Sequence, residues 1–183
     1  MARIPLLASR DGLSPAQTQV FDSIASGARG GVRGPHQVLL HRPAIASPVE
    51  RLGAFLRYEC RVPERQRELV ILVVAEFWKA DYEWFAHAPL AARQGHGADV
   101  LAAVGLGREP DLPDPADSAA WRVARELLDT RRITPASYAA AEAILGQEGM
   151  VDLVTLIGYY SLIAMTLDAF EVAVPEGAEI PWH

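Results

Sequence analysis

The feature that most constrains this chain is a helical pattern that is apolar on nearly every side. Six consecutive apolar residues, 69–74, follow Glu68. Leu69, Leu72 and Val73 recur at helical spacing, and their neighbours widen the apolar face until little polar surface remains. Such a helix is stable only when other elements surround it, so we expect it at the centre of the fold.

Pairs of a capping residue and a proline predict where several other helices begin. Ser14-Pro15, Ser47-Pro48 and Thr134-Pro135 each place a capping side chain before a proline at the first helical position. Strand signals are weak, because no run of useful length alternates apolar and polar residues and no Asn-Gly or Asp-Gly pair lies between two candidate strands. We therefore expect an all-α protein.

Breaks in the helical patterns divide the rest of the chain. Pro63 is expected to open the apolar helix, and a bend would make Asp81 the N-cap of the next helix, which would end near Gly95. Glycines and prolines predict loops at 27–34 and 105–117. The remaining expectations are helices at 99–104, 119–130, 135–145 and 150–173, and an extended tail at 174–183 that Trp182 docks.

Length and charge bound the domain organisation and the partners. A chain of 183 residues, 50% of them hydrophobic, can bury one substantial core, so we expect a single domain over 1–183. The formal net charge of −6 argues against a nucleic-acid partner, because phosphate binding favours clustered Lys and Arg. Arg65 and Arg67 lie close together, but Glu64 and Glu68 flank them.

Cysteine content and apolar runs bound the compartment. Cys60 is the only cysteine, so neither an internal disulfide nor a Cys-x-x-Cys redox pair can form. The most apolar run, 153–167, includes polar residues and is shorter than the roughly 20 apolar residues that a membrane-spanning helix needs. We interpret it as a core or interface helix and expect no membrane partner. The N-terminus lacks the apolar stretch of a signal peptide, so we expect a cytoplasmic protein.

Glu83 and His87 are the residues that most strongly suggest chemistry. Four residues apart on a helix, they lie on one face, one turn from each other. A carboxylate beside an imidazole can orient the ring or share its proton. The alternative is an ordinary pair on a helix surface. Glu68 precedes six apolar residues and is either exposed at the helix start or directed into a cavity.

Other reactive sites have less support. A metal ion needs three or four ligands, and His36, His41 and His96 do not stand at metal-ligand spacing, so we predict no metal. The GxSxG, P-loop and GxGxxG signatures are absent. Cys60 follows an apolar helical pattern and is interpreted as a quiet buried thiol rather than a nucleophile.

Several separated segments resemble one superfamily, that of carboxymuconolactone decarboxylase and alkylhydroperoxidase D. In that superfamily a glutamate precedes a Cys-x-x-Cys-x-x-x-His segment at a helix start. Here Glu68 stands 12 residues before Ala80, and Ala80, Glu83 and His87 fall at the two cysteine positions and the histidine position. With Tyr-Glu-Trp at 82–84, the chain resembles the cysteine-free branch of this superfamily.

Further segments extend the resemblance over residues 34–175. They are Gly34-Pro35 with 39–43, residues 67–69 with 71–72, and residues 156–160 with Met165 and Phe170. The resemblance implies an all-α, alkylhydroperoxidase D-like helical bundle whose central antiparallel helical hairpin carries the site. It also implies a homo-oligomer, a trimer or a hexamer, with sites near the subunit interfaces. The apolar run at 153–167 fits such an interface as well as it fits a core.

The resemblance implies a cofactor-independent lyase or isomerase that acts on a small anionic organic molecule. Its catalytic residues would be Glu68, Glu83 and His87. His87 would be the general acid–base, Glu83 would tune it or share its proton, and Glu68 would relay protons or position a water.

The resemblance also implies substrate-binding residues and leaves two alternatives open. Tyr82 and Trp84 would shape the pocket, and His41 and Arg42 would face the substrate carboxylate. One alternative is a peroxide-handling protein that keeps the proton relay; it would need a thiol such as Cys60, because dithiol peroxidases attack with one cysteine and resolve with a second. The other is a non-catalytic oligomeric protein that binds a small molecule.

Overall fold

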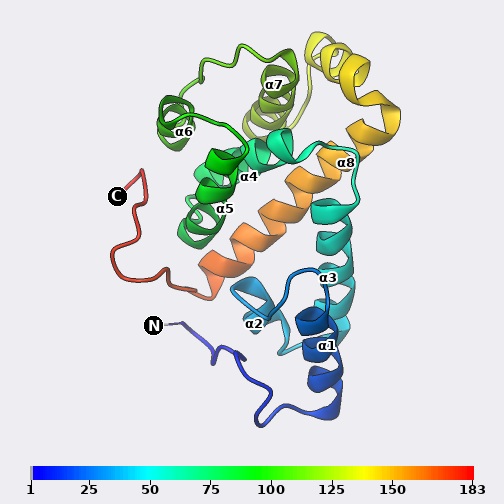
Figure 1. The fold of residues 1–183 in the computed structure, drawn as a ribbon, viewed down its shortest axis with the longest axis vertical. Helices are drawn as coiled ribbons and strands as arrows, with labels where there is room; N and C mark the ends of the chain where they lie inside the picture. Colours follow the sequence, from blue (N-terminus) through cyan, green and yellow to red (C-terminus); the bar gives the residue numbers. More distant parts are fainter. Residues whose placement is uncertain (1) are drawn as a thin grey trace. The chain divides into compact units, whose positions relative to one another are not determined.

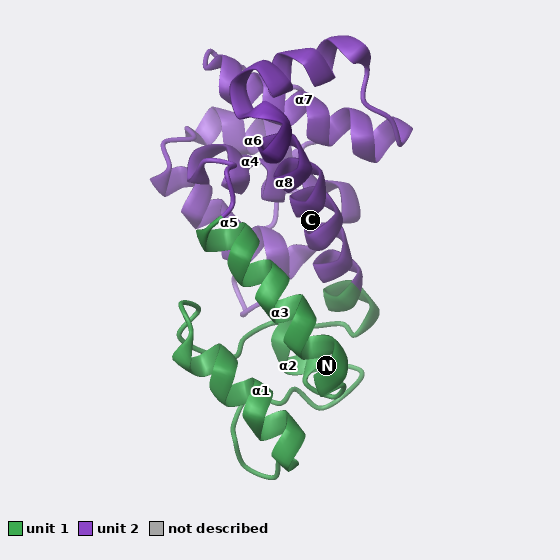
Figure 2. Ribbon diagram, turned by 90° about the vertical axis from the view of Figure 1, so that its right-hand side faces the viewer, with its two compact units in different colours: residues 1–59, 166–173 green, residues 60–165, 174–183 purple. Residues whose placement is uncertain are grey.

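The computed structural model describes residues 2–183, and over those residues it contains helices α1 to α8 and no strand (Figure 1). This confirms the expected all-α fold. The chain forms two compact units, residues 1–59 with 166–173 and residues 60–165 with 174–183 (Figure 2). The expectation of a single domain over 1–183 stays a prediction.

Unit 1 is built on three helices, α1 (Pro15–Ser26), α2 (Pro35–Leu39) and α3 (Pro43–Tyr58). Ile24, Val32 and Leu40 form its buried apolar cluster. Ser14 caps α1 as predicted, since its hydroxyl accepts a hydrogen bond from the backbone N–H of Gln17.

The predicted start of α3 at Ser47-Pro48 is wrong. Pro43 takes the first helical position, with Arg42 as the N-cap, and Pro48 lies inside the helix. Pro43 has the backbone φ that a helix start needs. Inside the helix Pro48 costs one backbone hydrogen bond, and α3 buries Ala46 and Leu56.

Unit 2 places the most apolar helix at its centre, as expected. That helix is α4 (Glu64–Trp78), and every residue from 66 to 76 is buried. It contacts the other helices of the unit that precede α8, which are α5 (Asp81–Arg93), α6 (Ala98–Gly105) and α7 (Pro115–Thr130).

The connection between α4 and α5 differs by one residue from the prediction. Lys79 adopts a left-handed conformation with φ 55°, Ala80 is the N-cap, and Asp81 is the first residue of α5. The carboxylate of Asp81 contacts the C-terminal tail. Trp182 Nε1 donates to Asp81 Oδ1 at 2.8 Å, and this contact confirms that Trp182 docks the tail.

A pair of a capping residue and a proline sets the start of α7, and a glycine interrupts α8. α7 begins at Pro115 with Asp114 as its N-cap, so the last part of the predicted 105–117 loop is helical. Asp114-Pro115 follows the same cap-proline pattern as the predicted helix starts. α8 (Pro135–Ala169) is interrupted at Gly146, which has φ 69° and ψ 176°, where the sequence predicted a gap between two helices.

α8 is the one helix over residues 2–183 that is long and apolar enough to cross a membrane by length and composition. Half of its apolar window is buried inside the protein. A helix at the core of a globular fold has the same length and composition. α8 therefore gives little support to a membrane-spanning role.

Candidate active site

The helical hairpin of α4 and α5 carries the three residues predicted to be catalytic, all in unit 2. Glu68 lies in the second turn of α4, and Glu83 and His87 lie on one face of α5. Their exposed fractions are 1%, 2% and 6%, so all three polar side chains are buried. Burial of this kind excludes the interpretation of Glu83 and His87 as an ordinary pair on a helix surface.

Glu68 and His87 form a direct pair. His87 Nδ1 lies 2.7 Å from Glu68 Oε2, a short distance that fits a charge-assisted hydrogen bond. A carboxylate in this position accepts the proton on Nδ1 and so fixes the tautomer of the neutral imidazole. Nε2 is then the nitrogen that can take up and release a proton.

Tyr160 of α8 holds the imidazole from another direction. Its ring meets that of His87 edge to face, with centroids 5.2 Å apart, and Tyr159 packs against Tyr160 at 5.3 Å. Tyr160 is buried, so this contact restricts the rotation of the His87 ring. Tyr160 was not among the site residues predicted from the sequence. Its only signal was a pair of tyrosines within a mostly apolar run.

Glu83 lies one turn before His87 on the same face of α5 and is as buried as Glu68. Its position in the first turn places it near the positive end of the helix dipole, which stabilises a carboxylate. Arg67 adds a cation on the other side of the pair, with Nε 3.8 Å from Glu68 Oε1. Two carboxyl groups, an imidazole and a guanidinium therefore belong to one buried region of unit 2.

The other predicted site residues are Tyr82 and Trp84 in unit 2 and His41 and Arg42 in unit 1. Trp84 is buried and packs against Trp182 of the tail, with centroids 5.4 Å apart, and Tyr82 is partly exposed and contacts Phe85. His41 and Arg42 are exposed in unit 1, where His41 Nε2 lies 2.7 Å from the Pro5 carbonyl oxygen. Their roles toward a substrate stay predictions.

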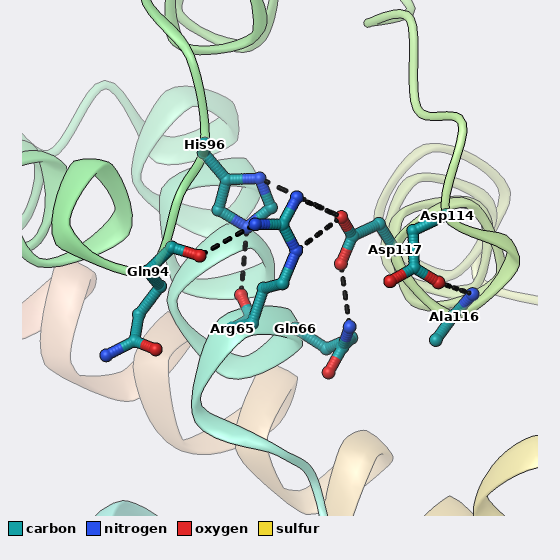
Figure 3. A network of polar contacts seen from close by, with 7 residues as sticks. All are labelled: Arg65, Gln66, Gln94, His96, Asp114, Ala116 and Asp117. Atoms are coloured by element: carbon teal, nitrogen blue, oxygen red, sulfur yellow. Dashed lines mark hydrogen bonds and ion pairs between the residues drawn. The ribbon is translucent and has the colours of Figure 1, made fainter.

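A second buried polar network in unit 2 supports the hairpin (Figure 3). Asp117, at the start of α7, accepts hydrogen bonds from Arg65 at 2.8 Å and from Gln66 at 2.7 Å. Arg65 also donates to the carbonyl of Gln94, and His96 Nε2 lies 3.0 Å from the carbonyl of Arg65. The network joins the start of α4 to the end of α5 and to α7.

Among residues 2–183, no group of three or more His, Cys, Asp or Glu side chains is placed to hold a metal ion.

Comparison with solved structures supports the fold. The chain has a TM-score of 0.76 to an alkylhydroperoxidase AhpD core, an uncharacterized peroxidase-related protein from Ralstonia eutropha JMP134, at 16% identity, covering 96% of this chain and 93% of that one. An uncharacterized peroxidase-related protein from Silicibacter sp. TM1040 gives 0.75 at 12% identity, with 97% and 93% covered.

A third structure is a variant of the debrominase Bmp8 in complex with 2,3,4-tribromopyrrole. Its TM-score is 0.73 at 12% identity, with 96% of this chain and 95% of that one covered. Identities this low show a shared fold and no more. No curated protein matches the chain.

A family model gives the evidence from sequence. The model of the Carboxymuconolactone decarboxylase family matches residues 43–126, a range that contains Glu68, Glu83 and His87. The matched range covers α3 to α6 and most of α7, and so includes the whole hairpin. With the shared fold, this match makes the chain similar to the carboxymuconolactone decarboxylase/alkylhydroperoxidase D-like superfamily over the region that contains the hairpin.

Proposed function

We propose that this protein is a cofactor-independent lyase or isomerase that acts on a small anionic organic molecule by acid–base chemistry. The observation that carries the proposal is the buried pair of Glu68 and His87, with 2.7 Å between carboxylate oxygen and imidazole nitrogen. A carboxylate that holds an imidazole in one tautomer is the arrangement that general acid–base catalysts use.

His87 is the proposed catalytic acid–base. With Nδ1 held by Glu68, Nε2 can remove a proton from a substrate carbon, and the resulting imidazolium is stabilised by the adjacent carboxylate. The same nitrogen can return the proton at another carbon, which is an isomerisation. Tyr160 would keep the ring at the angle at which Nε2 meets the substrate.

A decarboxylation would use the same group in the acid direction. The bond between the substrate carbon and its carboxylate breaks, the electron pair enters a conjugated carbonyl as an enolate, and carbon dioxide leaves. The imidazolium of His87 then delivers its proton to the enolate carbon. Glu83, one turn away on α5, would share that proton or adjust the charge of the pair.

The substrate-binding roles extend the proposal. Tyr82 and Trp84 flank Glu83 on α5 and would shape the pocket wall, Trp84 through packing. His41 and Arg42 would provide positive charge for the substrate carboxylate. An Arg42→Ala variant tests this part alone, since it should raise KM and leave kcat unchanged.

The experiment that tests the proposal is a turnover screen with lactone carboxylates, β-keto acids and organic hydroperoxides. The parent, His87→Gln and His96→Gln are compared in parallel. His96 is a matched control, because it is also a buried histidine of unit 2 and its Nε2 contacts a backbone carbonyl outside the pair. We expect turnover of a lactone or keto acid that His87→Gln loses and His96→Gln keeps.

Other outcomes would select other functions. Turnover of hydroperoxides with a requirement for Cys60 would replace the proposal with peroxide chemistry. Binding of a screened compound without turnover, unchanged in His87→Gln, would favour a non-catalytic binding protein. Equal turnover of an acid substrate by the parent and His87→Gln would remove His87 from the mechanism.

We further propose that the chain forms a homo-oligomer through α8. Val151, Val154, Leu162 and Met165 are exposed by 38% to 67%, and their spacing places them on one side of the helix. A row of exposed apolar side chains is typical of an oligomer interface. A Val151→Glu/Met165→Glu variant should therefore have a smaller mass than the parent in light scattering, while Tyr138→Glu, on another part of α8, should not.

A further inference from the structure

A groove on the outer side of α5 is separate from the acid–base pair. It is lined by side chains of α5 and α6 and by the tail: Trp84, Phe85, Ala88, Pro89, Ala92, Leu101, Ala102 and residues 177–181. At about 100° per residue, its α5 residues lie on roughly the opposite side of the helix from Glu83 and His87. The groove therefore lies on a different face of α5 from Glu83 and His87, and Trp84 is the one residue that it shares with the proposed substrate pocket.

The walls of the groove combine aromatic surface with hydrogen-bond acceptors. Trp84 and Phe85 supply the aromatic rings. Pro89 has no N–H, so the carbonyl of Phe85, four residues earlier in α5, lacks its intrahelical donor. Glu179 adds a carboxylate at the tail side, and it is the only charged side chain among the lining residues. A ligand that fits these walls is apolar and carries a positive hydrogen-bond donor.

The tail forms one wall because it is anchored beside the groove. Trp182 donates to Asp81, packs on Trp84, and has Lys79 Nζ 5.1 Å from its ring centroid. Pro181 lies directly on Gly105, where an added Cβ would come within 2.5 Å of the proline ring. The groove is thus complete only while the tail is docked.

We propose that this groove binds a small aromatic molecule that carries one ammonium group, and that binding is linked to docking of residues 177–183. The aromatic rings of the groove attract the ring of an arylalkylammonium, and its negatively charged and carbonyl hydrogen-bond acceptors attract the ammonium group. Because the tail supplies a wall, a ligand that binds the closed groove must also favour the docked tail, by reciprocal linkage. The proposal does not depend on the chemistry assigned to His87.

The test uses 2-phenylethylamine as the probe, with 2-phenylethanol and phenylacetate as neutral and anionic counterparts of the same size. Binding to the full chain is followed by the NMR signals of the indole N–H groups of Trp84 and Trp182. We expect the amine to bind roughly threefold to fivefold more tightly than the alcohol, and the acid to bind most weakly. Glu179→Gln should remove most of the preference for the amine and keep the binding of the alcohol.

Substitutions of the residues that line the groove distinguish binding in the groove from weak binding elsewhere on the surface. Ala102→Phe should fill the groove and abolish binding of the amine, whereas Tyr138→Ala, outside the groove, should leave it unchanged. Trp182→Ala and Gly105→Ala should each weaken binding by releasing the tail, and 2-phenylethylamine should slow proteolysis of the tail in the parent but not in Trp182→Ala. Equal affinity for amine, alcohol and acid, or unchanged binding in Ala102→Phe, would overturn the proposal. His87→Gln should bind the amine like the parent, whatever its effect on turnover.

Discussion

His36 in unit 1 and His87 in unit 2 are almost equally buried, at 4% and 6% exposure, yet their charged neighbours have opposite signs. His87 meets the carboxylate of Glu68, which stabilises a proton on the ring. His36 lies near the guanidinium of Arg29, and burial together with that cation lowers the pKa of His36 from 6.5 to about 4. The two rings thus share their burial, but His87 has a carboxylate beside it, whereas at His36 the guanidinium of Arg29 adds to the effect of burial in opposing a proton.

The largest expected effect separates the two histidines by activity. His87→Gln should lower kcat by about 10²- to 10⁴-fold, because general acid–base catalysis supplies a factor of that size. His36→Gln should leave kcat within the error of measurement, because His36 is not among the proposed catalytic residues and its lowered pKa makes it a poor acceptor of protons. Both are measured on the substrate that the turnover screen identifies.

A Glu68→Gln variant tests whether the charge of the carboxylate beside His87 is needed for turnover. The amide can still contact His87 Nδ1, but it carries no charge to stabilise an imidazolium. Its rate should therefore fall although the protein folds, as checked by circular dichroism. A Glu68→Gln enzyme as fast as the parent would show that the pair is structural.

The next effect concerns a third buried histidine, His96, which also lies near a carboxylate. Asp117 Oδ2 is 4.0 Å from His96 Nδ1, but that carboxylate already accepts hydrogen bonds from Arg65 and Gln66. Asp117→Ala would take the carboxylate from Arg65 and the hydrogen-bond acceptor from the buried Gln66 amide, so the free energy of unfolding should fall by about 3 to 5 kcal/mol. Urea denaturation measures it.

The turnover of folded Asp117→Ala shows whether the polar network around His96 acts on catalysis as well as on stability. Per folded molecule, kcat should stay close to that of the parent, because Asp117 supports the ends of α4 and α5 and does not contact His87. A loss of kcat as large as that of His87→Gln, at full folding, would place this network in the mechanism.

A somewhat smaller effect depends on pH. The unfolded chain binds a proton on His36 near pH 6.5, whereas the folded chain binds it only near pH 4. Below about pH 6.5 the unfolded state takes up more protons, so stability is lost as the pH falls toward 4, by up to about 3 kcal/mol from this group. Urea denaturation of the parent and His36→Gln at pH 7.5 and 4.5 measures it.

The expected result is that His36→Gln loses less stability than the parent between the two pH values. Carboxyl groups titrate in the same pH range. The difference in lost stability between the two proteins therefore isolates the contribution of His36. Identical losses in both proteins would mean that His36 accepts its proton in the folded state without cost.

Much of the fold followed from local patterns. The uninterrupted apolar surface of 69–74 predicted a central helix, and α4 is buried along most of its length because no face of it is polar enough for water. Ser14 and Thr134 predicted helix starts, since a side-chain oxygen and a following proline satisfy the first turn locally. Ser47 failed because an earlier proline, Pro43, met the same requirement first.

The site was only partly predictable from the sequence, because some of its contacts join different helices. Spacing alone placed Glu83 and His87 on one face of α5, because both belong to one helix. The pairing of Glu68 with His87 is a contact between helices, and it was expected only through the resemblance to a family. Tyr160 reaches the imidazole from α8, 73 residues later in the chain, and no local pattern encodes a contact at that separation.

The smallest expected effect belongs to the one thiol. Cys60 Sγ lies 3.7 Å from the carbonyl oxygen of Val62, between α3 and α4, and a serine hydroxyl can donate to the same oxygen. Cys60→Ser should therefore change the free energy of unfolding by no more than about 0.5 kcal/mol and should leave turnover of an acid substrate unchanged. Peroxide chemistry needs a thiolate that attacks oxygen, which a hydroxyl cannot replace. A Cys60→Ser protein that lost turnover while His87→Gln kept it would move the reactive centre from the imidazole to the thiol, and the contrast between His36 and His87 would then describe two structural histidines.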